Sequence, residues 1–172
     1  MKKIKVLIVD DSALMRRMLG DILSSDPRID VVGTAWDGQD GLEKIAALSP
    51  DVVTMDVEMP RKDGLAALEE IMRVCPMPVV MVSSLTQGGA EVTLKALSLG
   101  CVDFVGKPSG STSLNIQVVR AELISKVVMA STARVRPLRG GSAVESRPEP
   151  TFARRPGTSA GPRGQRDRKS VV

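Results

Sequence analysis

The stretch DVVTMDVEMP, residues 51–60, decides how this sequence folds. Residues 52–55 form a short apolar run, Asp56 follows it directly, and Met59-Pro60 predicts a sharp turn. A short strand that is apolar on both faces is typical of a parallel sheet, because helices cover both sides of such a sheet. The carboxyl ends of the strands line the crevice in which ligands bind. We therefore predict a buried strand at 52–55 that delivers the carboxylate of Asp56 to this crevice.

Four more apolar runs have the same character, and each ends at polar or turn-forming residues. They cover residues 4–9, 30–35, 79–82 and 102–105. Apolar residues at helical spacing separate these runs, which predicts helices after Ser12, after the Asp37-Gly38 turn, after Asp63, over 90–99 and over 114–129. Five strands alternating with five helices predict a doubly wound parallel α/β sheet. A single domain of about 130 residues favours the flavodoxin-like strand order 2-1-3-4-5.

The chain changes in composition near residue 130. Residues 1–130 carry 14 Lys and Arg against 17 Asp and Glu, whereas residues 131–172 carry ten against three, so the net charge of +4 comes from the second segment. Residues 131–168 have no sustained apolar period and are rich in Pro, Gly and Arg, which predicts a flexible, disordered basic linker. The two valines that follow Arg168-Lys169 are compatible with the first strand of another domain. We expect one domain over 1–130, a linker over 131–168 and the start of a second domain at 169–172.

Several functional classes are excluded by residue types that the sequence lacks. It contains no histidine, which excludes a Ser-His-Asp hydrolase mechanism within this chain, a histidine-ligated zinc site and phosphohistidine made in cis. Cys75 and Cys101 have no metal-binding spacing, and we expect both to be buried, reduced thiols. No stretch approaches the roughly 18 apolar residues of a membrane span, so we expect no membrane insertion and a cytoplasmic protein.

Polar side chains follow four of the predicted strands at the points where those strands end. Asp10 and Asp11 follow the first strand, Asp56 the third, Ser83 the fourth and Lys107 the fifth. Because these strand ends meet at one edge of the sheet, we expect the side chains to share one crevice. Two carboxylates about 4 to 5 Å apart repel by roughly 3 to 4 kcal/mol at an effective dielectric near 20, so three together need a divalent cation. Oxygen ligands of this kind suit Mg²⁺, and we predict a Mg²⁺ site.

The same side chains match what phosphoryl transfer requires, namely an in-line nucleophile and positive charge around the transferred group. Asp56 is the predicted nucleophile, Mg²⁺ and the Lys107 ammonium supply the positive charge, and the Ser83 hydroxyl binds a phosphoryl oxygen. Each residue taken alone is more often a turn or helix-capping residue. Their joint occurrence, each at the end of a separate strand, indicates a phosphoryl-transfer site centred on Asp56.

Four blocks of the sequence resemble those of two-component receiver domains. They are VLIVDDSALMR, TMDVEMPRKDG, VMVSSLT and DFVGKP, and the resemblance extends over residues 4 to about 128. It implies a role for each matching position: Mg²⁺ ligands at Asp10, Asp11, Asp56 and the main-chain carbonyl of Glu58, the phosphoacceptor at Asp56, the characteristic lysine at Lys107, and switch residues at Ser83 and Phe104. It also implies a histidine kinase on a separate chain as phosphodonor.

Residues 82–114, VSSLTQGGAEVTLKALSLGCVDFVGKPSGSTSL, resemble a narrower family, the chemotaxis-specific protein-glutamate methylesterases/glutaminases. In that family a catalytic domain with a Ser-His-Asp triad follows the receiver and a linker. The resemblance implies a chemotaxis histidine kinase, a C-terminal catalytic domain in cis and, indirectly, chemoreceptors as partners. This chain has no histidine and ends where that domain would start, so the implied role is a regulatory phosphoacceptor, and whether the chain is an enzyme stays open.

Two alternatives compete with this interpretation. One is a fragment of a transcriptional response regulator whose basic tail contacts DNA, although the tail has no helix-turn-helix pattern and supports no specific nucleic-acid binding. The other is an aspartyl-phosphate phosphatase, in which Glu58, two residues after the nucleophile, would be the general acid. The Asp10-Asp11 pair and Lys107-Pro108 fit a receiver better.

Overall fold

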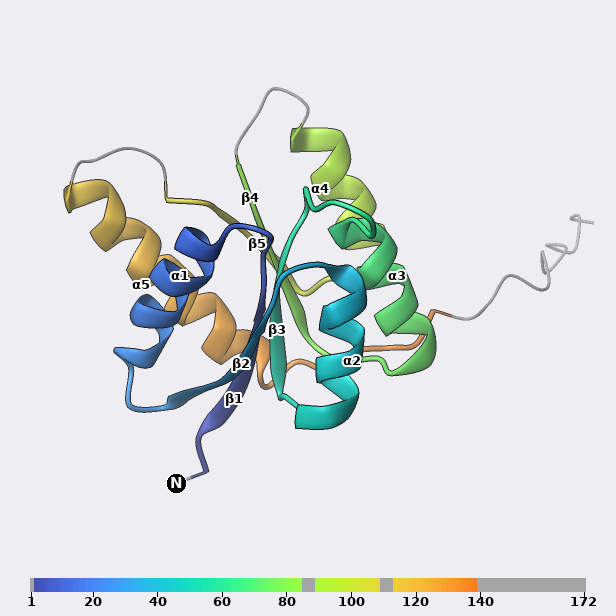
Figure 1. Cartoon of the computed structure of the whole chain (residues 1–172), viewed down its shortest axis with the longest axis horizontal. Coiled ribbons are helices and arrows are strands. Elements are labelled where there is room, and N and C mark those ends of the chain that lie inside the picture. The colour runs from blue at the N-terminus through green and yellow to red at the C-terminus, as the bar shows by residue number, and fades with distance from the viewer. Residues whose placement is uncertain (1, 85–88, 109–112, 139–172) are drawn as a thin grey trace, which may run out of the picture. The chain divides into compact units, whose positions relative to one another are not determined.

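The fold is described from a computed structural model, which defines residues 2–84, 89–108 and 113–138. All of these residues lie in the first of two units, Met1–Gly141. Five parallel strands form one sheet in the order β2-β1-β3-β4-β5 (Figure 1). The strands are β1 Ile4–Val9, β2 Ile29–Ala35, β3 Val52–Asp56, β4 Val79–Ser83 and β5 Asp103–Gly106. The predicted fold class and strand order are confirmed, and β3 and β4 each extend one residue further than predicted, to include Asp56 and Ser83.

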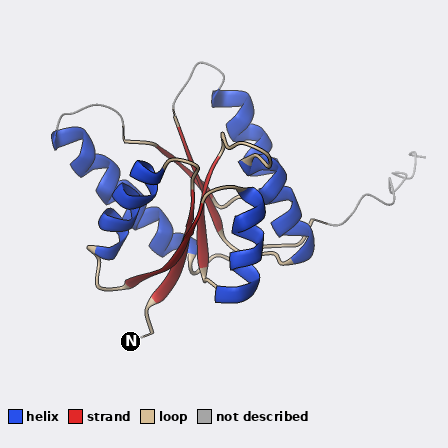
Figure 2. Ribbon diagram, in the orientation of Figure 1, coloured by secondary structure: helices blue, strands red, loops and turns tan. Residues whose placement is uncertain are grey.

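Five helices connect and follow the strands (Figure 2). They are α1 Ala13–Ser24, α2 Gly38–Leu48, α3 Gly64–Val74, α4 Gly89–Ser98 and α5 Ser113–Ala130. Polar N-caps begin the first three, because side-chain oxygens satisfy main-chain N–H groups that have no partner in the first turn. Ser12 accepts from the third residue of its helix at 3.3 Å, and Asp37 and Asp63 do the same at 2.8 Å. The helices predicted after Ser12 and Asp63 are therefore confirmed, and each of these residues is the N-cap of its helix.

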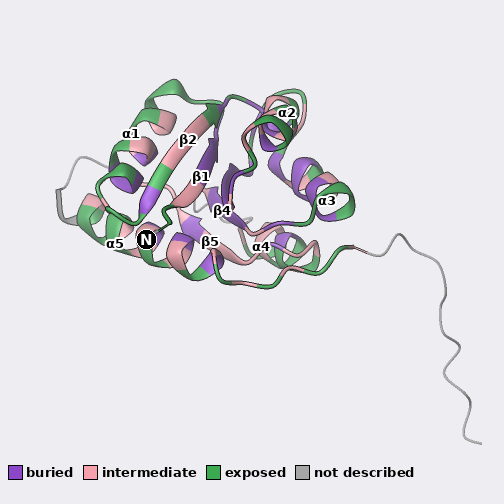
Figure 3. Cartoon of the chain, turned by 90° about the horizontal axis from the view of Figure 1, so that it is seen from below, coloured by how far each residue is buried: buried purple, intermediate pink, exposed green. Residues whose placement is uncertain are grey.

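The helices cover both faces of the sheet, with α1 and α5 on one face and α2, α3 and α4 on the other (Figure 1). The central strands lie between two apolar clusters and are buried along almost their whole length (Figure 3). Ile8 and Leu123 belong to the cluster under α1 and α5, and Leu7 and Leu68 to the opposite one. Burying such a side chain stabilises the fold by about 1.5 to 3 kcal/mol. This rigid sheet is what fixes the strand ends relative to one another.

Residues 131–138, which we name the strap, follow α5 and run along the edge of the sheet where the strands begin (Figure 1). Val135 and Leu138 pack against the apolar cluster of the α3 side. The main-chain N–H of Leu138 donates to the carbonyl of Met72 in α3 at 3.0 Å. The strap thus connects the α5 face to the α3 face. It is the only described part of the predicted linker; residues 139–168 and the predicted domain start at 169–172 lie outside the described residues.

The prediction that both cysteines are buried is wrong for one of them. Cys101 is buried, but Cys75 is exposed. The reason is its position: α3 turns Leu68, Ile71 and Met72 into the core and ends at Val74, so Cys75 follows the helix into solvent. None of the helices in the described part of the chain is long and apolar enough to cross a membrane.

Candidate functional site

Three strand ends bring two acids and one lysine together at the carboxyl edge of the sheet. Asp10 follows β1, Asp56 is the last residue of β3, and Lys107 follows β5. The Lys107 Nζ lies 2.7 Å from Oδ2 of Asp56 and 3.0 Å from Oδ2 of Asp10. Both acids are almost fully buried, with 0% of the surface of Asp10 and 2% of that of Asp56 exposed. The Lys107 ammonium, whose side chain is partly exposed, therefore bridges two buried carboxylates.

Asp11 completes the acidic group from the exposed side. Asp10, Asp11 and Asp56 each have one carboxylate oxygen that lies within 4.8 Å of those of the other two. The turn that carries Asp10 and Asp11 is held by Arg16, whose guanidinium donates to their main-chain carbonyls at 2.8 and 3.1 Å. The N–H of Ser12 donates to Oδ1 of Asp10 at 2.9 Å. The acids are thus fixed in place by the first turn of α1.

Burial and charge compete for control of the protonation states in this group. Burial raises the pKa of Asp56; a hydrogen bond from Lys107 opposes the rise, and the nearby Asp10 carboxylate adds to it. For Lys107, burial alone would lower the pKa, but hydrogen bonds to Asp56 and Asp10 outweigh it and the net shift is upward. Lys107 therefore stays charged, and Asp56 carries its negative charge at a cost in free energy.

The acidic group offers the ligands that a hard divalent cation prefers. Oδ2 of Asp10 and Oδ2 of Asp56 are buried, and among the described residues the Lys107 ammonium is the only polar partner found for either oxygen. Buried carboxylate oxygens with unused acceptor capacity fit Mg²⁺, which takes oxygen ligands and keeps several waters. Among the described residues, this is the one group of three acids close enough to share an ion.

The loop between β3 and α3, residues 57–63, depends on Gly64 for its shape. A Cβ atom on Gly64 would lie 1.9 Å from the main-chain oxygen of Asp56, so no other residue fits without moving the backbone. The N–H of Gly64 donates to the carbonyl of Val57 at 2.9 Å, which closes the loop. The N–H of Glu58 turns back to Oδ1 of Asp56 at 3.3 Å. Glu58, the predicted main-chain ligand, therefore directly adjoins the acidic group.

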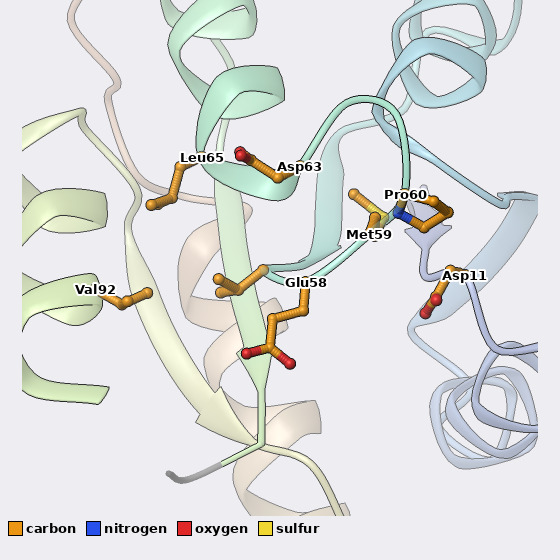
Figure 4. Close-up of a pocket in the computed structure, with 8 residues that line it drawn as sticks. Asp11, Glu58, Met59, Pro60, Asp63, Leu65 and Val92 are labelled. Carbon is orange, nitrogen blue, oxygen red and sulfur yellow. The ribbon is translucent and has the colours of Figure 1, made fainter. Parts of the chain in front are cut away.

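A cavity of about 440 Å³ lies beside the acids (Figure 4). It is lined by Asp11, Val57, Glu58, Met59, Pro60, Asp63, Leu65 and Val92. The side chains of Asp11 and Glu58 come from two different loops at the carboxyl edge of the sheet (Figure 4). The buried Asp10 and Asp56 do not line the cavity. The hollow has room for a small phosphate-bearing group next to the acids.

The two predicted switch residues lie on β4 and β5. Ser83 is half-buried at the end of β4, and its carbonyl accepts from the N–H of Lys107 at 2.8 Å. The Ser83 hydroxyl donates to the carbonyl of Ser84 at 3.2 Å. Phe104 is partly buried in β5 and lines, together with Lys107, a second cavity of about 370 Å³. The main chain thus places Ser83 beside the lysine, whereas Phe104 lies two residues before the end of β5, opposite Met81 of β4.

Sequence reasoning missed one ion pair next to this site. Arg61, in the loop after β3, pairs with the buried carboxylate of Asp37 at the start of α2. The sequence alone places Asp37 only in a turn before the second helix. The two residues are far apart in the sequence, and no spacing rule links them. The only local signal was an acid in front of Gly38, which also fits an ordinary helix cap.

Comparison with known proteins now defines the class. The sequence model of the response regulator receiver domain matches residues 6–119. The chain belongs to the response regulator receiver domain family. It is also similar to a narrower group: a protein-glutamate methylesterase/protein-glutamine glutaminase from Symbiobacterium thermophilum is 63% identical over 137 residues, which are 78% of this chain and 38% of that protein. Both resemblances seen in the sequence are thereby confirmed, and the chain spans well under half of that relative.

Solved structures agree with this placement. The crystal structure of the response regulator domain of Thermotoga maritima CheB is 50% identical, with a TM-score of 0.71, and covers 77% of this chain and 99% of its own. A structure of the CheX-CheY-BeF3-Mg²⁺ complex from Borrelia burgdorferi is 29% identical, with a TM-score of 0.64, and covers 77% of this chain and 92% of its own. The fold and the family are therefore shared over the described domain.

Proposed function

We propose that this chain is a phosphorylation-dependent switch in which Asp56 accepts a phosphoryl group in the presence of Mg²⁺. The observation that carries the proposal is the position of the buried Asp56 carboxylate. It lies 2.7 Å from the Lys107 ammonium, and one of its oxygens lies within 4.8 Å of a carboxylate oxygen of Asp10 and of Asp11. A carboxylate held next to fixed positive charge is what phosphoryl transfer requires. Membership of the receiver family supports the same reading.

Each residue has a defined part in the proposed reaction. A carboxylate oxygen of Asp56 attacks the phosphorus of the donor, the bond from phosphorus to the leaving group breaks, and an aspartyl phosphate forms. The Lys107 ammonium, already at Asp56, stays with the new phosphoryl oxygens, and the Ser83 hydroxyl turns from Ser84 toward them. Asp10, Asp11, Asp56 and the carbonyl of Glu58 would hold Mg²⁺, which supplies further positive charge to the transferred group when bound.

The chemistry of a relative supports the same assignment. The name of the Borrelia burgdorferi complex includes both BeF3 and Mg²⁺. Trifluoroberyllate bound to a carboxylate oxygen is tetrahedral and similar in size to a phosphoryl group, and the acids of the present chain offer a place for both it and the cation. We infer that Asp56 and its neighbours form such a site here, with Ser83 and Phe104 as the residues that respond to the new anion.

The partners follow from the similarity to methylesterases. We propose that a chemotaxis histidine kinase donates the phosphoryl group in the cytoplasm. Phosphorylation would then control a methylesterase/glutaminase domain attached in cis, and through it the chemoreceptors. The support is the 63% identity to a protein of that name. This chain covers 38% of that protein. We therefore assign the proposed catalytic activity to the attached domain and not to the described receiver domain.

A labelling experiment tests the central step. The chain is incubated with acetyl phosphate and Mg²⁺, and the intact mass is measured with and without hydroxylamine, which cleaves acyl phosphates. We expect one hydroxylamine-sensitive phosphoryl group, absent from Asp56→Asn and from samples with EDTA. Asp51→Asn is the matched control, because Asp51 precedes the same strand at its opposite end. Equal labelling of Asp56→Asn and of the unchanged chain would refute the assignment of Asp56.

A further inference from the structure

The loop that carries Glu58 is strained at Arg61. Arg61 has a φ of 64°, in the left-handed region that side chains with a Cβ adopt only at a cost. Asparagine, aspartate and glycine are the usual residues there, and a long, flexible arginine gains nothing from the conformation itself. Strain of this kind persists only where surrounding contacts compensate for it. The contacts of the Arg61 side chain therefore need an explanation.

Those contacts join the loop to the start of α2. The Arg61 guanidinium pairs with the carboxylate of Asp37, which is fully buried, and its Cζ lies 3.9 Å from the centre of the Trp36 ring. The main-chain carbonyl of Lys62 accepts a hydrogen bond from Gly38 at 3.2 Å. We name this set the Arg61 clamp: Arg61, its partners Trp36 and Asp37, and the Gly38-to-Lys62 hydrogen bond.

The clamp has no room for adjustment on the α2 side. A Cβ on Gly38 would lie 2.8 Å from the carbonyl oxygen of Lys62, so the two backbones are in close contact. Asp37 uses its other carboxylate oxygen to cap α2, which fixes the position of the carboxylate that Arg61 meets. A planar guanidinium can bind a carboxylate and stack on an aromatic ring at once, which an ammonium group does less well. The clamp thus holds the loop at a point three residues beyond Glu58.

We propose that Arg61 is a positioning residue for the cation site: the clamp holds the loop after β3 in the conformation that presents the Glu58 carbonyl beside Asp10, Asp11 and Asp56. The inference rests on the proposed Mg²⁺ site and adds to it the residue that preorganises its main-chain ligand. Without the clamp, the loop populates other conformations. The apparent affinity for the cation is then reduced in proportion to the fraction of molecules whose loop still has the binding conformation. Arg61 touches neither the acids nor the transferred group.

The sign of the effect separates this role from simple electrostatics. Removing a positive charge near an acidic group should strengthen the binding of a cation, because repulsion is removed. Loss of positioning should weaken it. Lys62→Ala is the matched control: it removes the same charge from the next residue of the loop, the ammonium group it removes pairs with Glu70, and alanine keeps the main-chain carbonyl that accepts from Gly38. Arg61→Ala should therefore weaken Mg²⁺ binding, whereas Lys62→Ala should leave the binding unchanged or strengthen it.

The experiment measures the dissociation constant of Mg²⁺ alone by calorimetry, with urea denaturation of each variant alongside. For Arg61→Ala we expect Mg²⁺ binding about three- to tenfold weaker, while Lys62→Ala binds as tightly as the unchanged chain or more tightly. Arg61→Gly adopts the left-handed conformation without strain, stays folded, and should show the same weakening. Unchanged or tighter binding in both Arg61 variants would overturn the positioning role. Absence of Mg²⁺ binding by the unchanged chain would instead overturn the proposed cation site itself.

Discussion

Replacing Gly64 by alanine is the most severe single-methyl change that the structure predicts near the site. The new Cβ would lie 1.9 Å from the main-chain oxygen of Asp56, 2.9 Å from its carbonyl carbon and 3.0 Å from Cα of Val57. All three atoms belong to the backbone, so no side-chain rotation relieves the overlap. Increasing the closest contact from 1.9 Å to 3.0 Å requires a backbone movement of about 1.1 Å, the difference between these two distances.

Two magnitudes follow from that movement. Overpacking a well-packed interior costs about 1 to 3 kcal/mol, and a clash with backbone belongs at or above the upper end, so we expect a loss of about 3 kcal/mol of unfolding free energy. For a domain of this size that corresponds to a melting temperature roughly 10 °C lower. A misplacement of about 1 Å at a reacting group costs on the order of 100-fold in rate, so labelling of Asp56 by acetyl phosphate should slow by about that factor.

The assay combines urea denaturation with a labelling time course, and Gly89→Ala is the matched control. Gly89 is the first residue of α4, and a Cβ there would meet no atom within 4 Å. Alanine in a helix costs less conformational entropy than glycine, so the control should be neutral or more stable by up to about 1 kcal/mol. If Gly64→Ala unfolds within about 0.5 kcal/mol of the unchanged chain and labels at the same rate, the reasoning about this contact is wrong.

Three further outcomes can be tested. Lys107→Ala, measured by urea denaturation in EDTA, should lose about 3 kcal/mol because it leaves two buried carboxylates unpaired, and Mg²⁺ should restore part of the loss; the same loss with and without Mg²⁺ would contradict this. At 100 times its dissociation constant, Mg²⁺ should stabilise the unchanged chain by about 2.7 kcal/mol but Asp56→Asn by less, since one ligand charge is missing. A thiol reagent should modify the exposed Cys75 and spare the buried Cys101. Burial raises the pKa of Cys101 from about 9 to about 11. The contribution of Cys101 to the free energy of unfolding should therefore be constant below pH 9 and fall between pH 9 and 11, and Cys101→Ala should remove this pH dependence.

Local patterns were sufficient to predict the sheet and the acidic group. The apolar runs that became strands are short, continuous and bounded by turn residues, and Ser12 and Asp63 precede their helices as ordinary caps. Asp10, Asp56 and Lys107 then converge because parallel strands end at one edge. No side-chain detail was needed for this step, since connectivity alone brings the three residues together.

The contacts that escaped prediction are those between segments distant in the sequence. Arg61 meets Asp37 through a left-handed backbone conformation that no residue type signalled, because arginine is not typical of that region. Val135 and Leu138 are two apolar residues among arginines, and two residues do not establish a period. Cys75 was misjudged because apolar neighbours in sequence do not reveal where a helix ends. Each case depends on tertiary packing, which a window of sequence does not contain.

The strap determines where any later segment is tethered. Because Leu138 is bound to Met72, the chain leaves the described domain on the α3 face and at the edge opposite Asp56, not at the end of α5. Cutting the chain at residue 130 would remove both the tether point and the cover that Val135 and Leu138 give to the core.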